Sequence, residues 1–215
     1  MNVNIKKTPS SGWALGKVHK GDWGETYISQ GLHSNDCGVA ALATILNGVT
    51  GTTDWDMERL KVGWRIPDLG KGNNIVQWGL EKTGLPFIYD EVIGATHPRG
   101  IVNEFNRIAR KNDIPYRAKR VSGAIKGDLL AEIEAGNPVS VIRIWDNNLG
   151  AHYQNIVGFD IATDTVYYTD SEDGLQGVQS LDWYTFNADW ERPLETYIPF
   201  VGTLQREMIV YQPKS

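Results

Sequence analysis

The chain holds a single cysteine, and the residues around it favour a reactive thiol. Cys37 follows Asn35 and Asp36, two residue types that cap helices, and precedes a run of small and apolar residues, 39–46, that favours a buried helix. A helix N-terminus presents unpaired N–H groups and about half a positive charge, both of which stabilise a thiolate. Cys37 is therefore a candidate nucleophile, the alternative being a small buried hydrophobic residue.

A nucleophilic cysteine needs a base, and the base needs an orienting acceptor. His152 opens a predicted strand, and Asp170 ends the next strand, so a turn at 160–164 would bring the two side by side. Asn155 is the rival orienting residue, but it lies three residues past His152 on one strand and should point to the opposite face. We therefore expect Asp170 to orient His152, although neighbouring strands can produce this spacing without catalysis.

An oxyanion formed beside Cys37 would need hydrogen-bond donors. Gln30 precedes Cys37 by seven residues, and its side-chain amide could donate together with the backbone N–H of Cys37. Taken alone, a glutamine in a loop is more often solvated than catalytic. The combination of Cys37, His152, Asp170 and an upstream glutamine carries more weight than any member.

The remaining histidines and acidic residues predict no metal or cofactor. His33 could share a metal with Cys37, but two ligands without further partners make a poor zinc site. His19 and His97 are interpreted as surface-loop residues, and the acidic run 170–173 as a solvated turn rather than a calcium site. The eight tryptophans are expected in the core and in the walls of a cleft.

The elements that must position these residues fall into two groups. Helical patterns occupy the first two-thirds of the chain, and period-2 patterns typical of strands the last third. Helices are predicted from Cys37 to an end at Asn47-Gly48 and over 54–62, 74–84, 101–112 and 127–135, and strands over 139–145, 152–160, 165–170 and 208–211. Helices followed by an antiparallel run predict an α+β fold. We expect one domain, 1–215, with a mainly helical part (about 1–135, beginning with an irregular segment) that carries the cysteine and a mainly antiparallel sheet (about 136–215) that carries the histidine and aspartate.

Composition narrows the classes of function. The 215 residues include 26 acidic and 21 basic side chains, a formal charge of −5, without a basic stripe, which argues against a nucleic-acid binder. No apolar run approaches the roughly 20 residues of a membrane span. The first residues lack a secretory apolar segment, and a lone cysteine fits a reducing compartment, so a cytoplasmic location is expected. Oligomeric state stays open.

Several segments together resemble a known family. The sequence from Gln30 to Leu42 (QGLHSNDCGVAAL) resembles the Gln…Asp-Cys-Gly-x-Ala-x-Leu signature of C39-like peptidases in the papain-like cysteine protease superfamily. Residues 150–160 are similar to that family's Gly-His block, 168–170 to its following Asp segment, and 181–190 to a Leu…Phe…Trp helix, so the resemblance covers about 30–190. The chain departs from the pattern in three ways: Ala151 separates Gly150 from His152, no proline follows Asp170, and Gln30 lies one residue farther upstream than is commonest.

The resemblance implies a papain-like fold, in which a helical subdomain packs against an antiparallel sheet. It also implies a cysteine peptidase that acts on a peptide or protein substrate, with Cys37, His152 and Asp170 as a triad and Gln30 in the oxyanion hole. Two alternatives remain. A papain-like acyltransferase, transglutaminase-type enzyme or amidase would use the same thioester, whereas a non-catalytic peptide-binding module would be expected to lack one of these residues.

Overall fold

The computed structural model describes residues 13–15, 27–30, 36–62, 97–144, 151–172, 177–195 and 203–214. Its helices are α1 (Cys37–Thr50), α2 (Met57–Val62), α5 (Pro98–Lys111), α6 (Lys126–Glu134) and α7 (Trp183–Trp190). Its strands are β1 (Trp13–Leu15), β2 (Tyr116–Val121), β3 (Val139–Ile144), β4 (Ala151–Asp160), β5 (Thr165–Asp170), β6 (Val178–Asp182), β7 (Leu194–Glu195), β8 (Thr203–Leu204) and β9 (Met208–Pro213). The predicted helix at 74–84 lies outside the described residues, as do His19 and His33.

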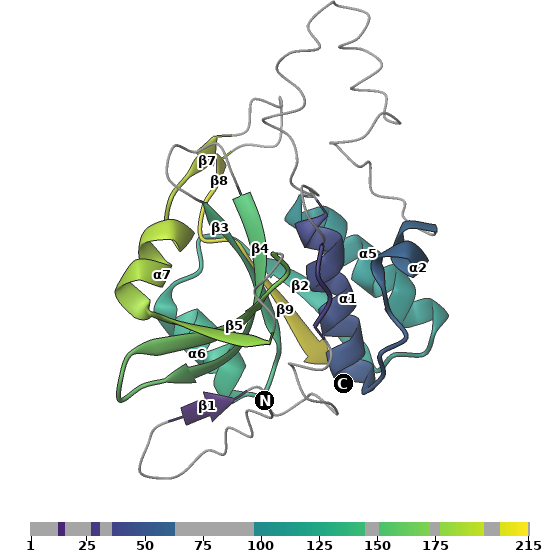
Figure 1. The fold of residues 1–215 in the computed structure, drawn as a ribbon, viewed down its shortest axis with the longest axis horizontal. Coiled ribbons are helices and arrows are strands. Elements are labelled where there is room, and N and C mark those ends of the chain that lie inside the picture. The colour runs from purple at the N-terminus through teal and green to yellow at the C-terminus, as the bar shows by residue number, and fades with distance from the viewer. Residues whose placement is uncertain are drawn as a thin grey trace, which may run out of the picture.

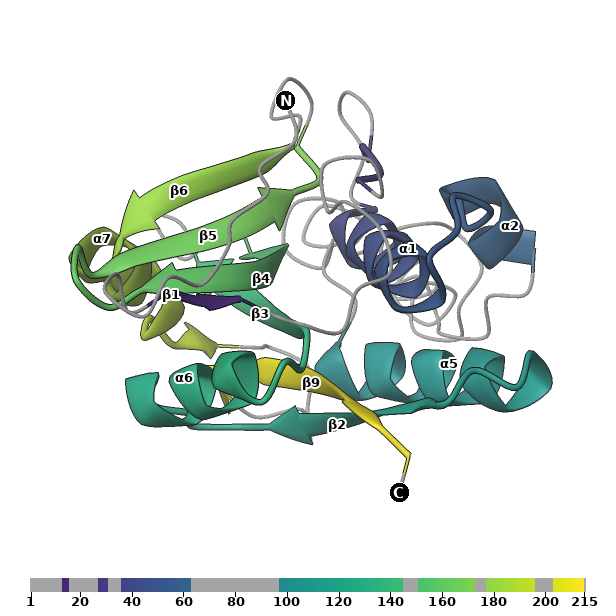
Figure 2. The same cartoon turned by 90° about the horizontal axis from the view of Figure 1, so that it is seen from below.

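The centre of the fold is an antiparallel sheet in the order β2-β9-β3-β4-β5-β6 (Figures 1 and 2). The short strand β1 also joins it, pairing with the far end of β4 from Trp13 opposite Asp160. Helices α1 and α5 lie on one side of this sheet and α6 and α7 on the other (Figure 1). Two separate clusters of buried apolar residues fill the two sides. This arrangement confirms the predicted α+β fold.

Helices on both faces explain why the central strands carry almost no polar face. All six residues of β3 are buried, as are all residues of β4 except Ala151. On β4, Tyr153 and Val157 belong to the cluster beneath α1, while Ile156 and Phe159 belong to the cluster beneath α6 and α7. The polar residues on these strands, including His152, are therefore held in a largely apolar layer.

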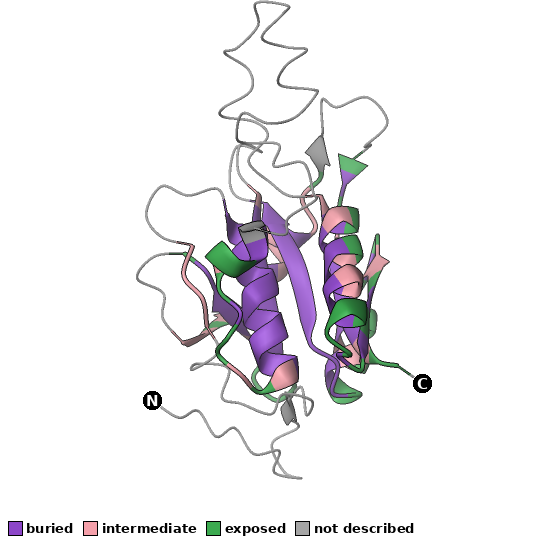
Figure 3. Ribbon diagram, turned by 90° about the vertical axis from the view of Figure 1, so that its right-hand side faces the viewer, coloured by how far each residue is buried: buried purple, intermediate pink, exposed green. Residues whose placement is uncertain are grey.

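Helix α1 is the most deeply buried helix among the described residues, and it extends beyond its predicted end. Every residue from Cys37 to Val49 is buried (Figure 3), and Gly51 ends the helix in a left-handed conformation with φ of 70°. The prediction of an end at Asn47-Gly48 was wrong because the side chain of Asn47 is hydrogen-bonded to the backbone of Trp55, and Gly51 forms the C-cap instead. Asn47 Oδ1 accepts from the N–H of Trp55 and Asn47 Nδ2 donates to the carbonyl of Trp55, both at 2.9 Å.

Other boundaries shift for similar reasons. The helix expected from residue 54 begins at Met57, because Asp56 accepts a hydrogen bond from the N–H of Arg59 at 2.7 Å and so occupies the cap position. Helix α5 begins at Pro98, and His97, interpreted from sequence as a surface-loop residue, caps it by accepting from the N–H of Arg99. The segment similar to a Leu…Phe…Trp helix divides into the end of β6 and α7.

Strand β2 was not predicted. Its buried Tyr116 and Ala118 alternate with the exposed Arg117 and Lys119, a period-2 pattern that could have revealed it. The strand pairs along its whole length with β9, from Tyr116 opposite Pro213 to Val121 opposite Met208. The charged positions are tolerated because β2 lies at one end of the strand order.

Among the residues that the structure describes, no helix is both long enough and apolar enough to span a bilayer.

The contact between Asn47 and Trp55 should be important for stability. We expect Asn47→Ala to lower the free energy of unfolding by about 2–4 kcal/mol, since it leaves the N–H and C=O of Trp55 without their partner in a buried position. Urea denaturation with an unchanged m-value would measure this. Asn112→Ala is the matched control. It removes one hydrogen bond, from the side-chain amide of an exposed residue to a helix carbonyl, and should lower the free energy of unfolding by about 1 kcal/mol or less. Equal losses in the two variants would contradict this account.

Candidate active site

Cys37 is the first residue of α1, and its side chain lies within the buried layer. The helix begins with a hydrogen bond from the N–H of Ala40 to the carbonyl of Asp36, at 2.9 Å. The N–H of Cys37 therefore precedes the first hydrogen bond of the helical ladder and points out of the helix N-terminus. The thiol thus sits where the helix dipole favours a negative charge.

His152 and Asp170 are in direct contact. His152 Nε2 lies 2.5 Å from Asp170 Oδ1, and the two residues are 7 % and 1 % exposed. A carboxylate can only accept, so Nε2 carries the proton of this bond. His152 is also hydrogen-bonded to Cys37. With Nε2 committed to Asp170, Nδ1 is the ring nitrogen that faces the thiol.

A β-bulge decides which residue of β4 faces Asp170. The pairing of β4 with β5 shifts by one residue between Ile156 and Gly158, so that Val157 is passed over and Gln154 lies opposite Asp170. Without this bulge the register would put Asn155 opposite Asp170. Because alternate residues share a face, the bulge brings Asp170 to the same face as Gln154 and His152. The turn at 160–164 is present, but the turn alone would not have produced the contact.

Asn155 projects from the opposite face of β4. Its Nδ2 donates to the carbonyl of Ala41 in α1 at 3.1 Å, and its Oδ1 accepts from Ser140 at 2.6 Å. Asn155 thus ties the sheet to the helix that carries Cys37. Of the two orienting candidates, Asp170 is the one bonded to His152.

The site favours charge on both members of the His152–Asp170 pair. Burial lowers the pKa of His152, but its hydrogen bonds to Asp170 and Cys37 and the negative charges of both outweigh burial and raise the pKa from 6.5 to about 10. Burial raises the pKa of Asp170, but the bonds from His152, from the N–H of Glu172 and from Gln154 outweigh it, so the pKa lies below 3.8. An imidazolium beside a carboxylate is thus the favoured state near neutral pH.

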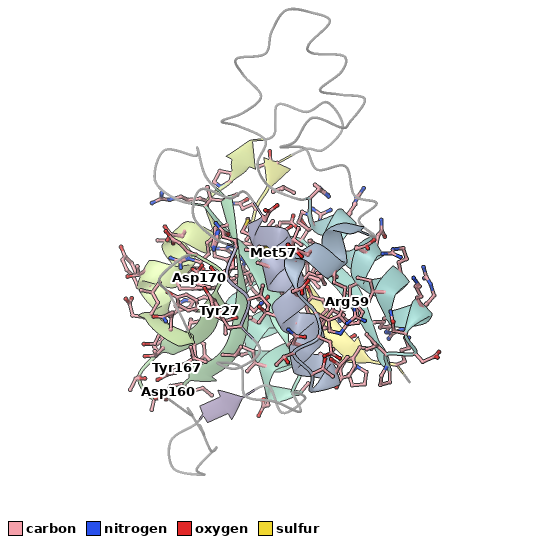
Figure 4. The ribbon with its side chains drawn as sticks, turned by 45° about the vertical axis from the view of Figure 1, so that its right-hand side comes forward. Tyr27, Met57, Arg59, Asp160, Tyr167 and Asp170 are labelled. Atoms are coloured by element: carbon pink, nitrogen blue, oxygen red, sulfur yellow. The ribbon has the colours of Figure 1, made fainter. Side chains whose placement is uncertain are left out.

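Gln30 lies in a segment that runs between α1 and the end of β5. Ile28 donates its N–H to Thr44 of α1 at 3.1 Å, and Gln30 donates its N–H to the carbonyl of Ser171 at 2.8 Å. The hydroxyl of Ser171 donates to Gln30 Oε1 at 3.1 Å, which sets the orientation of the amide and leaves Nε2 as its donor end. Tyr27 also reaches this region, its hydroxyl donating to the carbonyl of Glu172 (Figure 4 labels Tyr27 and Asp170).

The structure thus links Cys37, His152 and Asp170 through hydrogen bonds and attaches Gln30 to them through Ser171, the residue after Asp170. Two contributors were missed from sequence: Ser171, and Gln154, whose Nε2 donates to Asp170 Oδ2. Gln154 could have been found, because it lies two residues after His152 and so on the same face. Within the ranges that the structure describes, no three or more His, Cys, Asp or Glu side chains are grouped to hold a metal ion.

Comparisons with known proteins identify the family and the fold of the chain. Residues 25–195 match the model of the Peptidase C39-like family. The crystal structure of a Bacillus anthracis protein named as a C39-like peptidase superposes with a TM-score of 0.56 at 18% sequence identity, covering 94% of this chain and 98% of the other. At that identity the superposition shows a shared fold, and the fold is papain-like. A comparison with curated proteins gave no significant match.

The electrostatic description can be checked by NMR titration of the imidazoles. We expect His152 to remain protonated up to about pH 10 in the native protein, and His97, whose pKa is lowered by burial and by Arg120, to titrate below 6.5. Asp170→Ala should lower the pKa of His152, because it removes the carboxylate bonded to Nε2. Asn155→Ala is the matched control and should leave the pKa of His152 unchanged. It should lower thermal stability, since it removes the hydrogen bond from Asn155 to the carbonyl of Ala41 in α1. A fall in the His152 pKa only in Asn155→Ala would show that the assignment of faces is wrong.

Proposed function

Because the chain belongs to the Peptidase C39-like family, we propose that it hydrolyses peptide bonds through Cys37 as nucleophile, His152 as acid and base, and Asp170 as the residue that orients His152. The observation that carries the proposal is the buried hydrogen-bonded series from Cys37 through His152 to Asp170, which starts at a helix N-terminus. A nucleophile, a base within hydrogen-bond reach and a third group that orients the base are the three parts that covalent catalysis requires.

The first half of the reaction forms an acyl-enzyme. The Cys37 thiolate attacks the carbonyl carbon of the substrate, and the carbonyl electrons move to the oxygen. The N–H of Cys37 and Nε2 of Gln30 donate to this oxyanion. As the tetrahedral intermediate collapses, His152 Nδ1 gives its proton to the leaving amine and the C–N bond breaks.

The second half releases the acid product. His152 Nδ1, now without its proton, takes one from a water molecule, which attacks the thioester. Collapse of the second intermediate expels the Cys37 thiolate and leaves His152 as imidazolium again, so protons and charges return to their starting state. Throughout, Nε2 keeps its proton and donates it in a hydrogen bond to Asp170, which holds the ring orientation and stabilises the imidazolium.

The reactivity of the thiol gives the most direct test. An ordinary thiol with a pKa near 8.5 is ionised to only about 0.3% at pH 6. If Cys37 is paired with an imidazolium, iodoacetamide should alkylate it at pH 6 at least about tenfold faster than it alkylates free cysteine, and mass spectrometry of the only cysteine peptide would locate the adduct. His152→Ala should abolish the advantage. Labelling of the native protein no faster than that of free cysteine would refute the proposed function.

The role of Gln30 can be separated from that of the thiol. Gln30→Ala should lower peptide turnover by about 10²–10³, because an oxyanion donor acts on the transition state. Alkylation of Cys37 should change little, since it needs no oxyanion hole. Gln205→Ala is the matched control: it removes an exposed amide that donates to the carbonyl of Glu191 and should leave turnover unchanged. Turnover retained in Gln30→Ala would exclude Gln30 from the site.

A further inference from the structure

We propose that Gln154 is a positioning residue for this reaction, fixed in place by Arg143 of β3 and Asp189 of α7. These three residues, called here the relay, lead from the carboxylate of Asp170 to helix α7. The inference rests on the proposed function, because it assigns to Gln154 the task of holding Asp170 against His152.

The contacts of the relay are continuous. Gln154 Nε2 donates to Asp170 Oδ2, the oxygen that His152 does not use. Gln154 Oε1 accepts from Arg143 Nη1 at 3.0 Å, and Arg143 Nη2 donates to Asp189 Oδ2. Gln154 and Arg143 each therefore make one contact toward the site and one away from it.

The hydrogen bonds of the relay are largely buried, which makes them stronger and costly to exchange for water. Gln154 is 1 % exposed and Arg143 7 %, so neither can exchange its partner for bulk water without cost. In a site of low dielectric constant, a hydrogen bond to a carboxylate is stronger and more orienting than at the surface. With one oxygen held by His152 and the N–H of Glu172 and the other by Gln154, rotation of the Asp170 carboxylate would break bonds at both oxygens.

The chemistry of each residue type suits its place. An amide can donate to Asp170 and accept from Arg143 at the same time, whereas a carboxylate at position 154 would repel Asp170 and an apolar side chain would leave Oδ2 without a donor. The planar guanidinium of Arg143 reaches both Gln154 and Asp189, and it lies near the ring of Phe186, at 5.6 Å. Asp189 balances its positive charge, so the charge of Asp170 remains available to His152.

A purely structural role is the competing explanation. Arg143 and Asp189 could simply fasten α7 to the sheet, with Gln154 filling space between them. The two explanations differ in what they predict for the thiol. Loss of α7 anchoring would change stability, whereas loss of positioning would change how firmly the imidazolium is held beside Cys37, and therefore how the reactivity of Cys37 depends on pH.

The test is the pH profile of Cys37 alkylation by iodoacetamide in the full chain. We expect Gln154→Met, similar in length but without a donor or acceptor, to move the acid limb of the profile to higher pH, slowing labelling at pH 6 by about tenfold. At pH 9, where ordinary thiols are also largely ionised, its rate should match that of the native protein. Asp189→Ala, at a partly exposed position, should shift the acid limb in the same direction by a smaller amount, and it carries the test if Gln154→Met does not fold.

Asp182→Ala, at the N-cap of the same helix, is the matched control. Asp182 caps α7 by accepting from the N–H and hydroxyl of Thr185, at 2.9 and 2.8 Å, and it makes no contact that belongs to the relay. Its removal should destabilise α7 and leave the alkylation profile at the native position. An unchanged acid limb in Gln154→Met, or in Asp189→Ala where only that variant folds, would overturn the proposal. So would an Asp182→Ala shift as large as that of Asp189→Ala.

A second measurement separates this inference from the proposed function. The proton resonance of His152 Nε2–H reports the bond to Asp170 whether or not Cys37 reacts. The relay predicts that this resonance moves or broadens in Gln154→Met and stays in place in Asp182→Ala. Slow labelling of the native thiol would refute the proposed function alone, whereas an unmoved resonance in Gln154→Met would refute the positioning role alone.

Discussion

The structure of the site depends on one hydrogen bond, from His152 Nε2 to Asp170 Oδ1, made in a layer that is covered by helices on both sides. Burial alone would drive the imidazole toward its neutral form, so the charged state depends on the nearby negative groups. The sign of this coupling also governs stability. The interactions that raise the pKa of His152 stabilise the fold fully below about pH 6.5, and this contribution falls as the pH rises toward 10. The interactions that lower the pKa of Asp170 stabilise the fold above pH 3.8, and this contribution is lost in acid.

The backbone makes this bond possible through a single irregularity. The bulge at Val157 rotates the first half of β4 relative to β5, so that His152 and Gln154 share a face with Asp170 while Asn155 turns toward α1. Each face of the strand thus has a separate task. One holds the ionisable pair, and the other anchors the helix whose first residue is Cys37. Because the same strand does both, the distance from thiol to imidazole is set by sheet-to-helix packing rather than by a flexible loop.

The hydrogen bonds around Asp170 extend this rigidity to distant parts of the chain. Ser171 connects the end of β5 to Gln30, and Gln154 connects Asp170 to Arg143 and α7. Residues far apart in sequence are thereby held together by largely buried hydrogen bonds. In such a network the removal of one member leaves another with an unmade bond, and this is costly away from water.

The sequence by itself determined the fold class, four strands and several helices to within a few residues, and the residue types of the candidate site, because periodicity and helix signals are local. It also pointed to the family, through residues clustered around Cys37 and His152. Only the tertiary structure decided the register that brings Asp170 to the same face as His152, since the bulge at Val157 leaves no distinctive local pattern. The same holds for strand β2, which depends on β9 some 90 residues away, and for the partners of Gln154, which come from other elements. Such contacts arise from packing between segments, and no single segment encodes them.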